Sequence, residues 1–384
     1  MTKRPFTVSR RMVLAGGAAM AATAVSTRPA FAAPSSGNKL AVIILRGALD
    51  GLAAVPPSID QLADWRPNVM PENPLRLTSS FALHPALGGL HGLYTGGEAS
   101  IVHAVASPYR GRSHFVGQDL LESGSTGDVL RDGWLNRALQ SAPTPLSAVS
   151  IGPATPLVLR GPAEVGTWSP PVLPEASGDT LARLGDLYAD DPMLGSALAQ
   201  AVELDAAASD MTSMGRTARG DEAGAALPAL ARLMAAENGP DIGVASVGGW
   251  DSHAGQIGQL NNALSRLDAA LLAMKDEFGA AWARTQVAVV TEFGRTVKEN
   301  GTRGTDHGTG GAAFLLGGAV AGGQILGDWP GLAERDLFEG RDLAPANDLR
   351  AIFMAMLGQQ FGFSRSELTR TVFPGANGVL PLTI

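Results

Sequence analysis

The chain has 384 residues, and its 36 aspartates and glutamates outnumber its 29 lysines and arginines, giving a formal net charge of −7 that argues against nucleic acid or an anionic lipid surface as a partner. It contains no cysteine, which excludes disulfides, thiolate metal sites and a cysteine nucleophile. The length allows one large or two ordinary domains, and 48 glycines with few aromatic residues are typical of a loop-rich α/β enzyme.

The N-terminus has the features of an export signal. Ser9–Leu14 (SRRMVL) is a twin-arginine sequence, a mildly apolar run follows it, and Ala30-Phe31-Ala32 has the small-x-small form that signal peptidase accepts. A membrane anchor is the alternative, but the apolar run is short and rich in glycine and alanine. We predict that residues 1–32 are a signal peptide, and that the twin-arginine translocase exports the folded protein to the periplasm or the medium with no stable membrane insertion after processing.

Short apolar runs alternate with helical periodicity along the rest of the chain, which predicts an α/β fold with a mainly parallel sheet. The expected strands are Leu40–Leu45, Ser100–Val105, Ser147–Ile151, Ile242–Val247, Val287–Thr291 and Ala313–Leu316. The expected helices are 255–278 and 347–361, with shorter ones at 113–123, 134–140 and 227–236.

Two segments depart from this alternation. Ser141–Pro174 is rich in proline, and Ala206–Gly224 is small and polar with weak periodicity. We interpret them as the edges of an insertion rather than as linkers between domains. The prediction is a single domain over residues 33–384 with an insertion or cap at 141–240.

Polar residues follow the first two expected strands. Asp50 lies in a tight turn after the first strand, and Arg110, Arg112 and Ser113 precede the helix that follows the second. A serine in that position can simply cap the helix. The alternative is that helix N–H groups and the two arginines bind an anion there.

Later strand ends carry acids and histidines. Asp251 and His253 follow a strand and a Gly-Gly pair, Glu292 ends another strand, and Asp306 with His307 precedes the last strand. Taken alone, Glu292 is typical of a salt-bridge partner for Arg295, and the other histidines, His84, His91 and His103, are typical of loop or core groups. Ligands bind at the carboxyl ends of strands in open α/β sheets, so the shared location predicts a carboxylate and imidazole metal site with a nucleophile.

The motifs LRGALDG, GRSHFVGQDLLESG, GWLNRAL, GGWDSHAGQ, VVTEFGRT and TDHGTGGAAFLLGGAVAGG follow the twin-arginine signal in this order. The chain thereby resembles a large bacterial family of exported proteins of unknown function in the alkaline-phosphatase-like superfamily, which includes sulfatases and cofactor-independent phosphoglycerate mutases. The resemblance implies an alkaline-phosphatase-like three-layer sandwich, in which helices cover both faces of a mainly parallel sheet.

The resemblance also implies a ligand set for one or two divalent ions, Zn or Mn, at Asp50, Asp251, His253, Glu292 and His307, with Ser113 as the hydroxyl nucleophile. This sequence departs from the superfamily pattern in two ways. Asp251 and His253 are two residues apart where four is usual, and Phe293 follows Glu292 where histidine is common. One imidazole is then missing unless Asp306, His114 or His84 contributes.

The implied activity is hydrolysis of an anionic phosphate ester, or less readily a sulfate ester, by Ser113, with Arg112 or Arg110 holding the ester oxygens. Formylglycine chemistry is excluded, because no cysteine exists and neither Ser107 nor Ser113 has the required context. One alternative is a metal-binding or assembly protein that has lost turnover, which Phe293 favours. Another is a serine hydrolase that uses Ser113, which lacks the G-x-S-x-G elbow.

Overall fold

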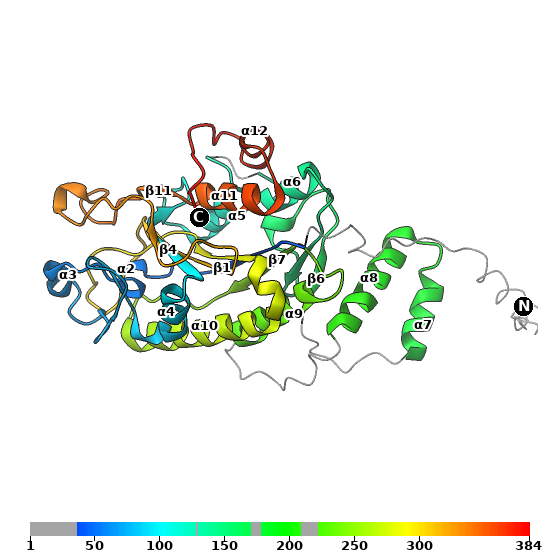
Figure 1. The fold of residues 1–384 in the computed structure, drawn as a ribbon, viewed down its shortest axis with the longest axis horizontal. Coiled ribbons are helices and arrows are strands. Elements are labelled where there is room, and N and C mark those ends of the chain that lie inside the picture. The colour runs from blue at the N-terminus through cyan, green and yellow to red at the C-terminus, as the bar shows by residue number, and fades with distance from the viewer. Residues whose placement is uncertain (1–36, 128–129, 170–177, 209–221) are drawn as a thin grey trace, which may run out of the picture.

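The computed structural model describes residues 37–127, 130–169, 178–208 and 222–384, so the predicted signal peptide lies outside the described residues. A nine-stranded sheet runs through the molecule in the order β10-β4-β9-β8-β1-β7-β5-β6, with β11 beside β4 (Figure 1). Its strands are β1 (Lys39–Leu45), β4 (Ala99–Ala106), β5 (Ala148–Ile151), β6 (Gly166–Trp168), β7 (Ile242–Val247), β8 (Thr285–Thr291), β9 (Gly311–Leu316), β10 (Ile325–Leu326) and β11 (Asn347–Asp348). A small hairpin pairs β2 (Leu75–Arg76) with β3 (Ala82–Leu83).

Most strand pairs of the large sheet are parallel. β1 is parallel to both of its neighbours, β7 and β8, and β5 is parallel to β7 and β6. β9 is antiparallel to β4 and β8, between which it lies. The predicted α/β class with a mainly parallel sheet is confirmed, and each of the six expected strands is present.

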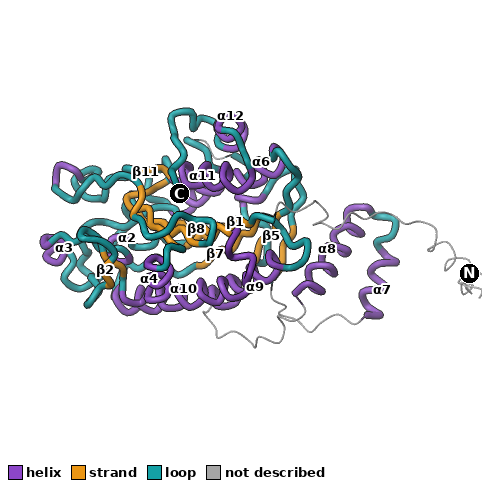
Figure 2. Tube along the Cα trace, in the orientation of Figure 1, coloured by secondary structure: helices purple, strands orange, loops and turns teal. Residues whose placement is uncertain are grey.

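The central strand β1 explains the layered packing. All seven of its residues are buried, as expected for a strand covered on both faces. Ile43 and Leu45 pack into a core with helices α4 (Gly88–Thr95), α9 (Glu222–Ala235) and α10 (Gln256–Phe278). Val42 and Ile44 point the other way, toward α5 (His114–Ser123), α6 (Trp134–Ser141) and α11 (Leu349–Phe361). Figure 2 shows these helices on the two sides of the strands, which confirms the three layers.

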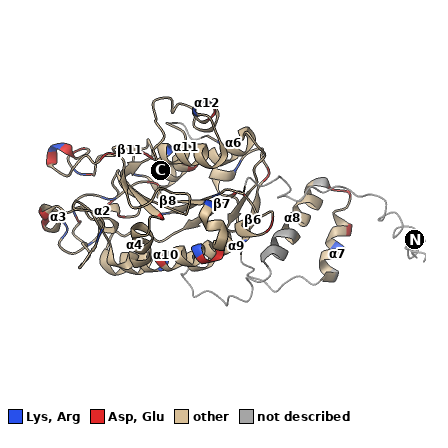
Figure 3. Cartoon of the chain, in the orientation of Figure 1, with Lys and Arg blue, Asp and Glu red and all other residues tan. Residues whose placement is uncertain are grey.

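The helices begin and end where local chemistry dictates. The Asp348 carboxylate caps α11 by accepting the N–H of Arg350 at 2.8 Å, and Gly362 ends that helix in the left-handed conformation. Where α9 and α10 meet, acidic and basic segments lie side by side in Figure 3, and Arg232 forms an ion pair with Glu277. None of the helices in the described ranges combines the length and apolar character needed to cross a bilayer.

The region from 141 to 240 contributes directly to the sheet. β5 and β6 form one end of it, and α9 packs against β7 and α10. The remaining pair, α7 (Gly178–Leu187) and α8 (Pro192–Ala208), projects beside that end of the sheet, where α8 meets β6 and α9 (Figure 1). Residues 209–221 of the predicted boundary lie outside the described part, and the extent of an insertion stays a prediction.

The described part of the chain also contains three short α-helices: α2 (Gly51–Ala54), α3 (Asp60–Trp65) and α12 (Arg365–Glu367). α2 begins directly after the turn that follows β1, and Asp50 caps it by accepting the N–H of Ala53 at 3.2 Å. The first turn after the central strand is therefore fixed by a carboxylate that lies close to the candidate site.

Candidate metal centre

Five connecting segments meet at one edge of the sheet. They follow β1, β4, β7 and β8 at their carboxyl ends, and the fifth leads into β9. Because β9 is antiparallel to β4 and β8, its beginning lies at the same edge as the ends of those strands. The topology therefore brings together polar residues that are far apart in the sequence.

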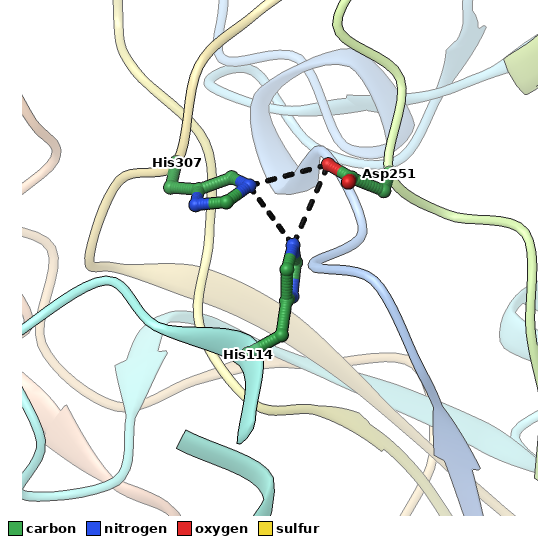
Figure 4. Close-up of side chains that lie close together, drawn as sticks. All are labelled: His114, Asp251 and His307. Carbon is green, nitrogen blue, oxygen red and sulfur yellow. Dashed lines mark hydrogen bonds and ion pairs between the residues drawn. The ribbon is translucent and has the colours of Figure 1, made fainter. Parts of the chain in front are cut away.

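Four side chains direct ligand atoms at one another there. Nε2 of His114 lies 2.9 Å from Nε2 of His307, and these atoms lie 3.5 and 3.3 Å from Oδ1 of Asp251 (Figure 4). Nε2 of His253 lies 3.0 Å from both His307 Nε2 and Asp251 Oδ1. We call His114, Asp251, His253 and His307 the four-residue cluster.

These separations fit the first coordination sphere of a divalent cation. Nitrogen and oxygen ligands bonded at about 2.0–2.2 Å to a tetrahedral ion lie roughly 3.3 Å apart. The distances among His114, His307 and Asp251, 2.9 to 3.5 Å, bracket that value, and Nε2 of His253 lies 3.0 Å from the ligand atoms of His307 and Asp251. Imidazole and carboxylate together are a donor set suited to zinc or manganese.

Each imidazole of the cluster is oriented by an acceptor at its other nitrogen. Nδ1 of His114 contacts Oε1 of Glu292 at 2.8 Å, and Nδ1 of His253 contacts Oδ1 of Asp306 at 3.2 Å. Nδ1 of His307 contacts the main-chain oxygen of Arg112 at 2.9 Å. A carbonyl or an ionised carboxylate only accepts, so Nδ1 carries the hydrogen in all three rings.

The tautomers strengthen the case for a cation. When the three rings are neutral, their Nε2 lone pairs face the centre, beside the negative charge of Asp251. Lone pairs at these distances repel unless a proton or a metal ion lies between them. Outer carboxylates that fix the tautomer and orientation of ligating histidines are typical of metal sites. The donor set and its outer partners therefore fit a bound divalent cation.

The charges around the cluster shift the pKa values of its members. The hydrogen bond to Glu292 raises the pKa of His114, whereas burial lowers the pKa of His307. Burial alone would raise the pKa of Asp251, but the hydrogen bond and charge of Arg295 lower it overall. Burial would likewise raise the pKa of Glu292, but hydrogen bonds from His114 and Gln118 lower it overall. Both carboxylates are thus held in their ionised forms.

Arg295 ties the converging segments together. It is fully buried, and it donates to the main-chain oxygens of Gly47, Ala48, Trp250 and Thr305 and to Oδ1 of Asp251. These acceptors belong to the segments after β1, after β7 and before β9. A salt bridge between Arg295 and Glu292 was the alternative to a metal-binding role for Glu292. The structure pairs Arg295 with Asp251 instead, and Glu292 is bound by His114, Gln118 and Gly47.

Backbone features explain how the segments approach so closely. Gly47 has φ +117, and a Cβ there would lie 2.7 Å from the main-chain nitrogen of Asp251. A Cβ at Gly304 would lie 2.3 Å from the carbonyl of His253. Arg112 adopts a left-handed conformation, with φ +58, that is uncommon for a residue with a side chain, and its carbonyl is the acceptor for His307. The strained backbone at Arg112 thus places the carbonyl that orients the His307 ring.

Asp50 lies outside the four-residue cluster. Its Oδ2 accepts from Arg66 at 2.8 Å and from Gln256, and both Asp50 and Arg66 are buried. Gln256 in turn accepts from Ser252 and Thr305, which flank the cluster. Asp50 therefore supports the segments that carry the ligands, through a buried ion pair and a bridging amide.

The predicted catalytic group lies beside the cluster. Ser113 precedes His114 at the N-cap position of α5, but its side chain makes no capping hydrogen bond, and its N–H donates to the Tyr109 hydroxyl at 3.0 Å. The Arg112 guanidinium binds Asp342 and Glu339, and Arg110 binds the main-chain oxygens of Ser107 and Tyr109. The two predicted ester-binding arginines are thus engaged by groups of the protein itself.

Of the predicted ligands, Asp251, His253 and His307 lie in the cluster, whereas Glu292 and Asp306 contact it through histidine rings. His114, which the sequence offered as one of three substitutes for a missing imidazole, belongs to the cluster. Phe293, the residue in place of the expected histidine, is buried and stacks on His114 with ring centroids 5.0 Å apart. This stacking contact helps to hold the His114 ring in place.

Solved structures with a similar course of the chain were found at low identity. The C-terminal periplasmic domain of EcEptC from Escherichia coli, in complex with Zn, gives a TM-score of 0.39 and 10% identity over 89% of this chain and 88% of that chain. The lipoteichoic acid synthase LtaP from Listeria monocytogenes gives 0.40 and 7% identity over 96% and 81%. No curated protein matches the chain.

A family model described as a protein of unknown function, DUF1501, matches residues 83–372. The matched segment contains the whole four-residue cluster, both outer carboxylates and Ser113, whereas Asp50 precedes it. Since it spans well over half of the sequence, the chain belongs to the DUF1501 family.

Proposed function

We propose that the protein is an exported, metal-dependent hydrolase of phosphate esters, with sulfate esters as poorer substrates, on an alkaline-phosphatase-like scaffold. The observation that carries the proposal is the four-residue cluster: the ligand atoms of His114, His307 and Asp251 lie close together, and Nε2 of His253 lies 3.0 Å from those of His307 and Asp251. The tautomers of all three imidazoles are fixed. His114, Asp251, His253 and His307 would hold the ion. A divalent cation bound there supplies Lewis acidity toward an ester oxygen.

The position of Ser113 supports hydrolysis rather than metal storage. Its hydroxyl is half-buried at the N-terminus of α5, next to a residue of the cluster, and it does not cap its own helix. The first N–H groups of a helix and the helix dipole favour an anion at that end. An anionic ester bound there would lie beside a hydroxyl able to attack it, and the attack would need no modified residue.

A non-catalytic metal-binding or assembly protein is the second candidate. The engagement of Arg112 by Asp342 and Glu339 favours it, because no guanidinium of that segment is left to hold an ester oxygen in this arrangement. On this alternative the cluster would still bind a metal ion, and Ser113 would be a plain loop residue. The two candidates therefore differ in turnover and agree on metal content.

Two measurements test the proposal. Metal content of protein purified from the periplasm should fall in His114→Ala and His253→Ala, with affinity lowered about 100-fold or more, since a structural zinc site of roughly 10 kcal/mol is shared among about four ligands. His91→Ala is the matched control, because His91 lies outside the cluster and its Nε2 contacts the main-chain oxygen of Arg76 at 2.9 Å. Full metal content in both cluster variants would contradict the metal centre.

A panel of chromogenic phosphomonoesters, phosphodiesters and sulfate esters tests the reaction. We expect turnover of a phosphate ester by the native protein, and its loss in Ser113→Ala with the metal retained. A Ser113→Ala protein as active as the native one would exclude Ser113 as nucleophile. Metal binding with no turnover of any ester would favour the non-catalytic candidate.

Export is proposed from the sequence, and it has its own test. Replacing Arg10 and Arg11 together by lysine should leave folded protein in the cytoplasm, because the twin-arginine pair identifies the route. Processed chain recovered from the periplasm at undiminished yield would contradict this route.

A further inference from the structure

We propose that the centre is built for a single divalent cation and that the guanidinium of Arg295 supplies the second positive charge beside it. This inference rests on the metal centre of the proposed function and concerns its number of ions, not its turnover. The motivating observation is that Asp251, the one carboxylate of the four-residue cluster, is shared between the histidine rings and Arg295.

The geometry places the Arg295 charge where a second ion would otherwise be expected. Arg295 Nη2 lies 2.5 Å from Asp251 Oδ1, the same oxygen that faces the three histidine rings. An ion bonded to this oxygen at about 2.1 Å, with the two contacts about 120° apart, would be about 4 Å from that nitrogen. Ions of two-metal sites lie roughly 3.5–4 Å apart, often across a shared ligand. The Arg295 guanidinium thus lies at the distance from the first ion, and on the same shared carboxylate, that a second ion would have.

Arg295 is held too firmly to give way to an ion. Its side chain is fully buried, and four main-chain oxygens accept from Nε, Nη1 and Nη2 in addition to Asp251. A guanidinium stays protonated in proteins, so this charge is permanent. A second divalent ion would have to approach a fixed positive charge about 4 Å away, which is unfavourable.

Asp50 is a second acid for which an arginine takes the place that a metal ion would have. Asp50, to which the sequence resemblance assigned a metal ion, is paired with buried Arg66 at 2.8 Å and accepts two further hydrogen bonds. Glu292 is likewise occupied, by His114, Gln118, Thr291 and the Gly47 N–H. Among the described residues, Asp50 and Glu292 are thus engaged by protein donors, and Asp306 accepts from Asn300 and contacts His253.

The test counts ions in the full-length processed protein. Protein stripped with a chelator and reloaded with Zn²⁺ should retain one ion per chain by native mass spectrometry. Two tightly held ions would overturn the single-ion proposal and leave the metal-dependent hydrolase intact. Zero ions would overturn both proposals. One ion without ester turnover would support the single-ion centre and contradict only the hydrolase.

A matched pair of variants isolates the charge. Arg295→Gln and Arg295→Lys both lose most hydrogen bonds to the segments, but only lysine keeps the positive charge. We expect Arg295→Gln to bind Zn²⁺ at least about tenfold more tightly than Arg295→Lys, and to accept a second ion at excess zinc, because a unit charge about 4 Å away is removed. Equal affinities and a count of one in both would overturn the role of Arg295. If neither variant folds, the count in the native protein decides.

Discussion

The outer carboxylates Glu292 and Asp306 would act on an ion in the four-residue cluster through histidine rings. Glu292 accepts from His114 and Asp306 from His253, and neither acid directs an oxygen into the four-residue cluster in the contacts observed. Such partners fix the ring orientation and raise the basicity of the ligand. Their residue types alone would suggest direct ligands, as the sequence did.

We therefore expect Glu292→Gln and Asp306→Asn each to weaken zinc binding about 10- to 100-fold without changing the number of ions. Glu299→Gln is a suitable control, since Glu299 binds Asn68 at the surface. Chelator competition measures the affinities. Loss of the ion altogether in either variant would show that the carboxylate is a direct ligand.

For Asp50 we expect a loss of stability and no change in the number of bound zinc ions. Asp50→Asn removes one partner of a buried ion pair and leaves the Arg66 guanidinium without its counter-charge, which typically costs about 3–5 kcal/mol of unfolding free energy. Urea denaturation of the metal-free proteins should show this loss, while the zinc count stays at the native value. Normal stability with a lower zinc count would restore Asp50 as a ligand.

These residues also show where sequence reasoning stops. Acids and histidines at strand ends identified the site, because strand ends of a parallel sheet meet at one edge. Whether a carboxylate would bind an ion directly or through a histidine ring depends on side-chain placement, which the spacing of residues in the sequence does not encode. Arg66, the partner of Asp50, lies in a loop with no periodic signal. Arg295 pairs with Asp251, although Glu292 is nearer to it in the sequence.

At the scale of elements, α5 carries both Ser113 and His114 at its first turn. The sequence predicted the helix, and the structure begins it at His114. Which of two adjacent residues faces the site depends on the rotation of the helix about its axis, and packing of Leu120 and Leu121 against the protein fixes that rotation. The pattern therefore favoured Ser113 as the key residue and gave His114 only as one of three options.

Two serines at helix starts make a matched comparison. Ser364 caps α12 in a capping box with Glu367, whereas the Ser113 side chain caps nothing. Ser364→Ala should cost about 1 kcal/mol of unfolding free energy, and Ser113→Ala should stay within about 0.5 kcal/mol. Denaturant unfolding of both variants measures this. An equal loss at Ser113 would mean that the hydroxyl caps α5 in solution and is not free for chemistry.

At the scale of the molecule, the regular elements were predictable and the irregular ones were not. β7 has the predicted bounds, and β8 begins two residues earlier than expected, at Thr285, because pairing with β1 extends it over a polar Thr-Gln start. The antiparallel direction of β9 was not predicted, since strand direction depends on the connection rather than on composition. The helices α7 and α8 fall almost wholly between the proline-rich segment 141–174 and the small, polar segment 206–224, where no element was predicted.

The pH dependence of the stability of the fold should depend in part on His103, a histidine outside the four-residue cluster. His103 is buried in β4, where its Nε2 donates to the Val55 carbonyl at 2.9 Å, its Nδ1 accepts from the Ala104 N–H, and its ring packs on Phe81 and Trp329. Burial lowers the pKa of His103 to about 4, although the carboxylate of Asp50 works in the opposite direction. Both ring nitrogens are occupied, so the neutral form fits the site.

His103 is therefore protonated at a lower pH in the folded protein than in the unfolded chain. Above pH 6.5 neither state binds it, and the residue has no effect on the pH dependence. Between pH 6.5 and about 4 the unfolded chain is protonated at this position while the folded protein is not, so stability falls as the pH falls, by about 3 kcal/mol over the whole window at about 1.4 kcal/mol per pH unit. His103→Gln keeps a donor and an acceptor but cannot titrate.

Urea unfolding between pH 6.5 and about 4 should therefore show a smaller loss of stability for His103→Gln than for the native protein, by up to about 3 kcal/mol. The cluster histidines are common to both proteins and do not affect the difference. Parallel curves would show that His103 accepts a proton in the folded state as readily as in the unfolded chain.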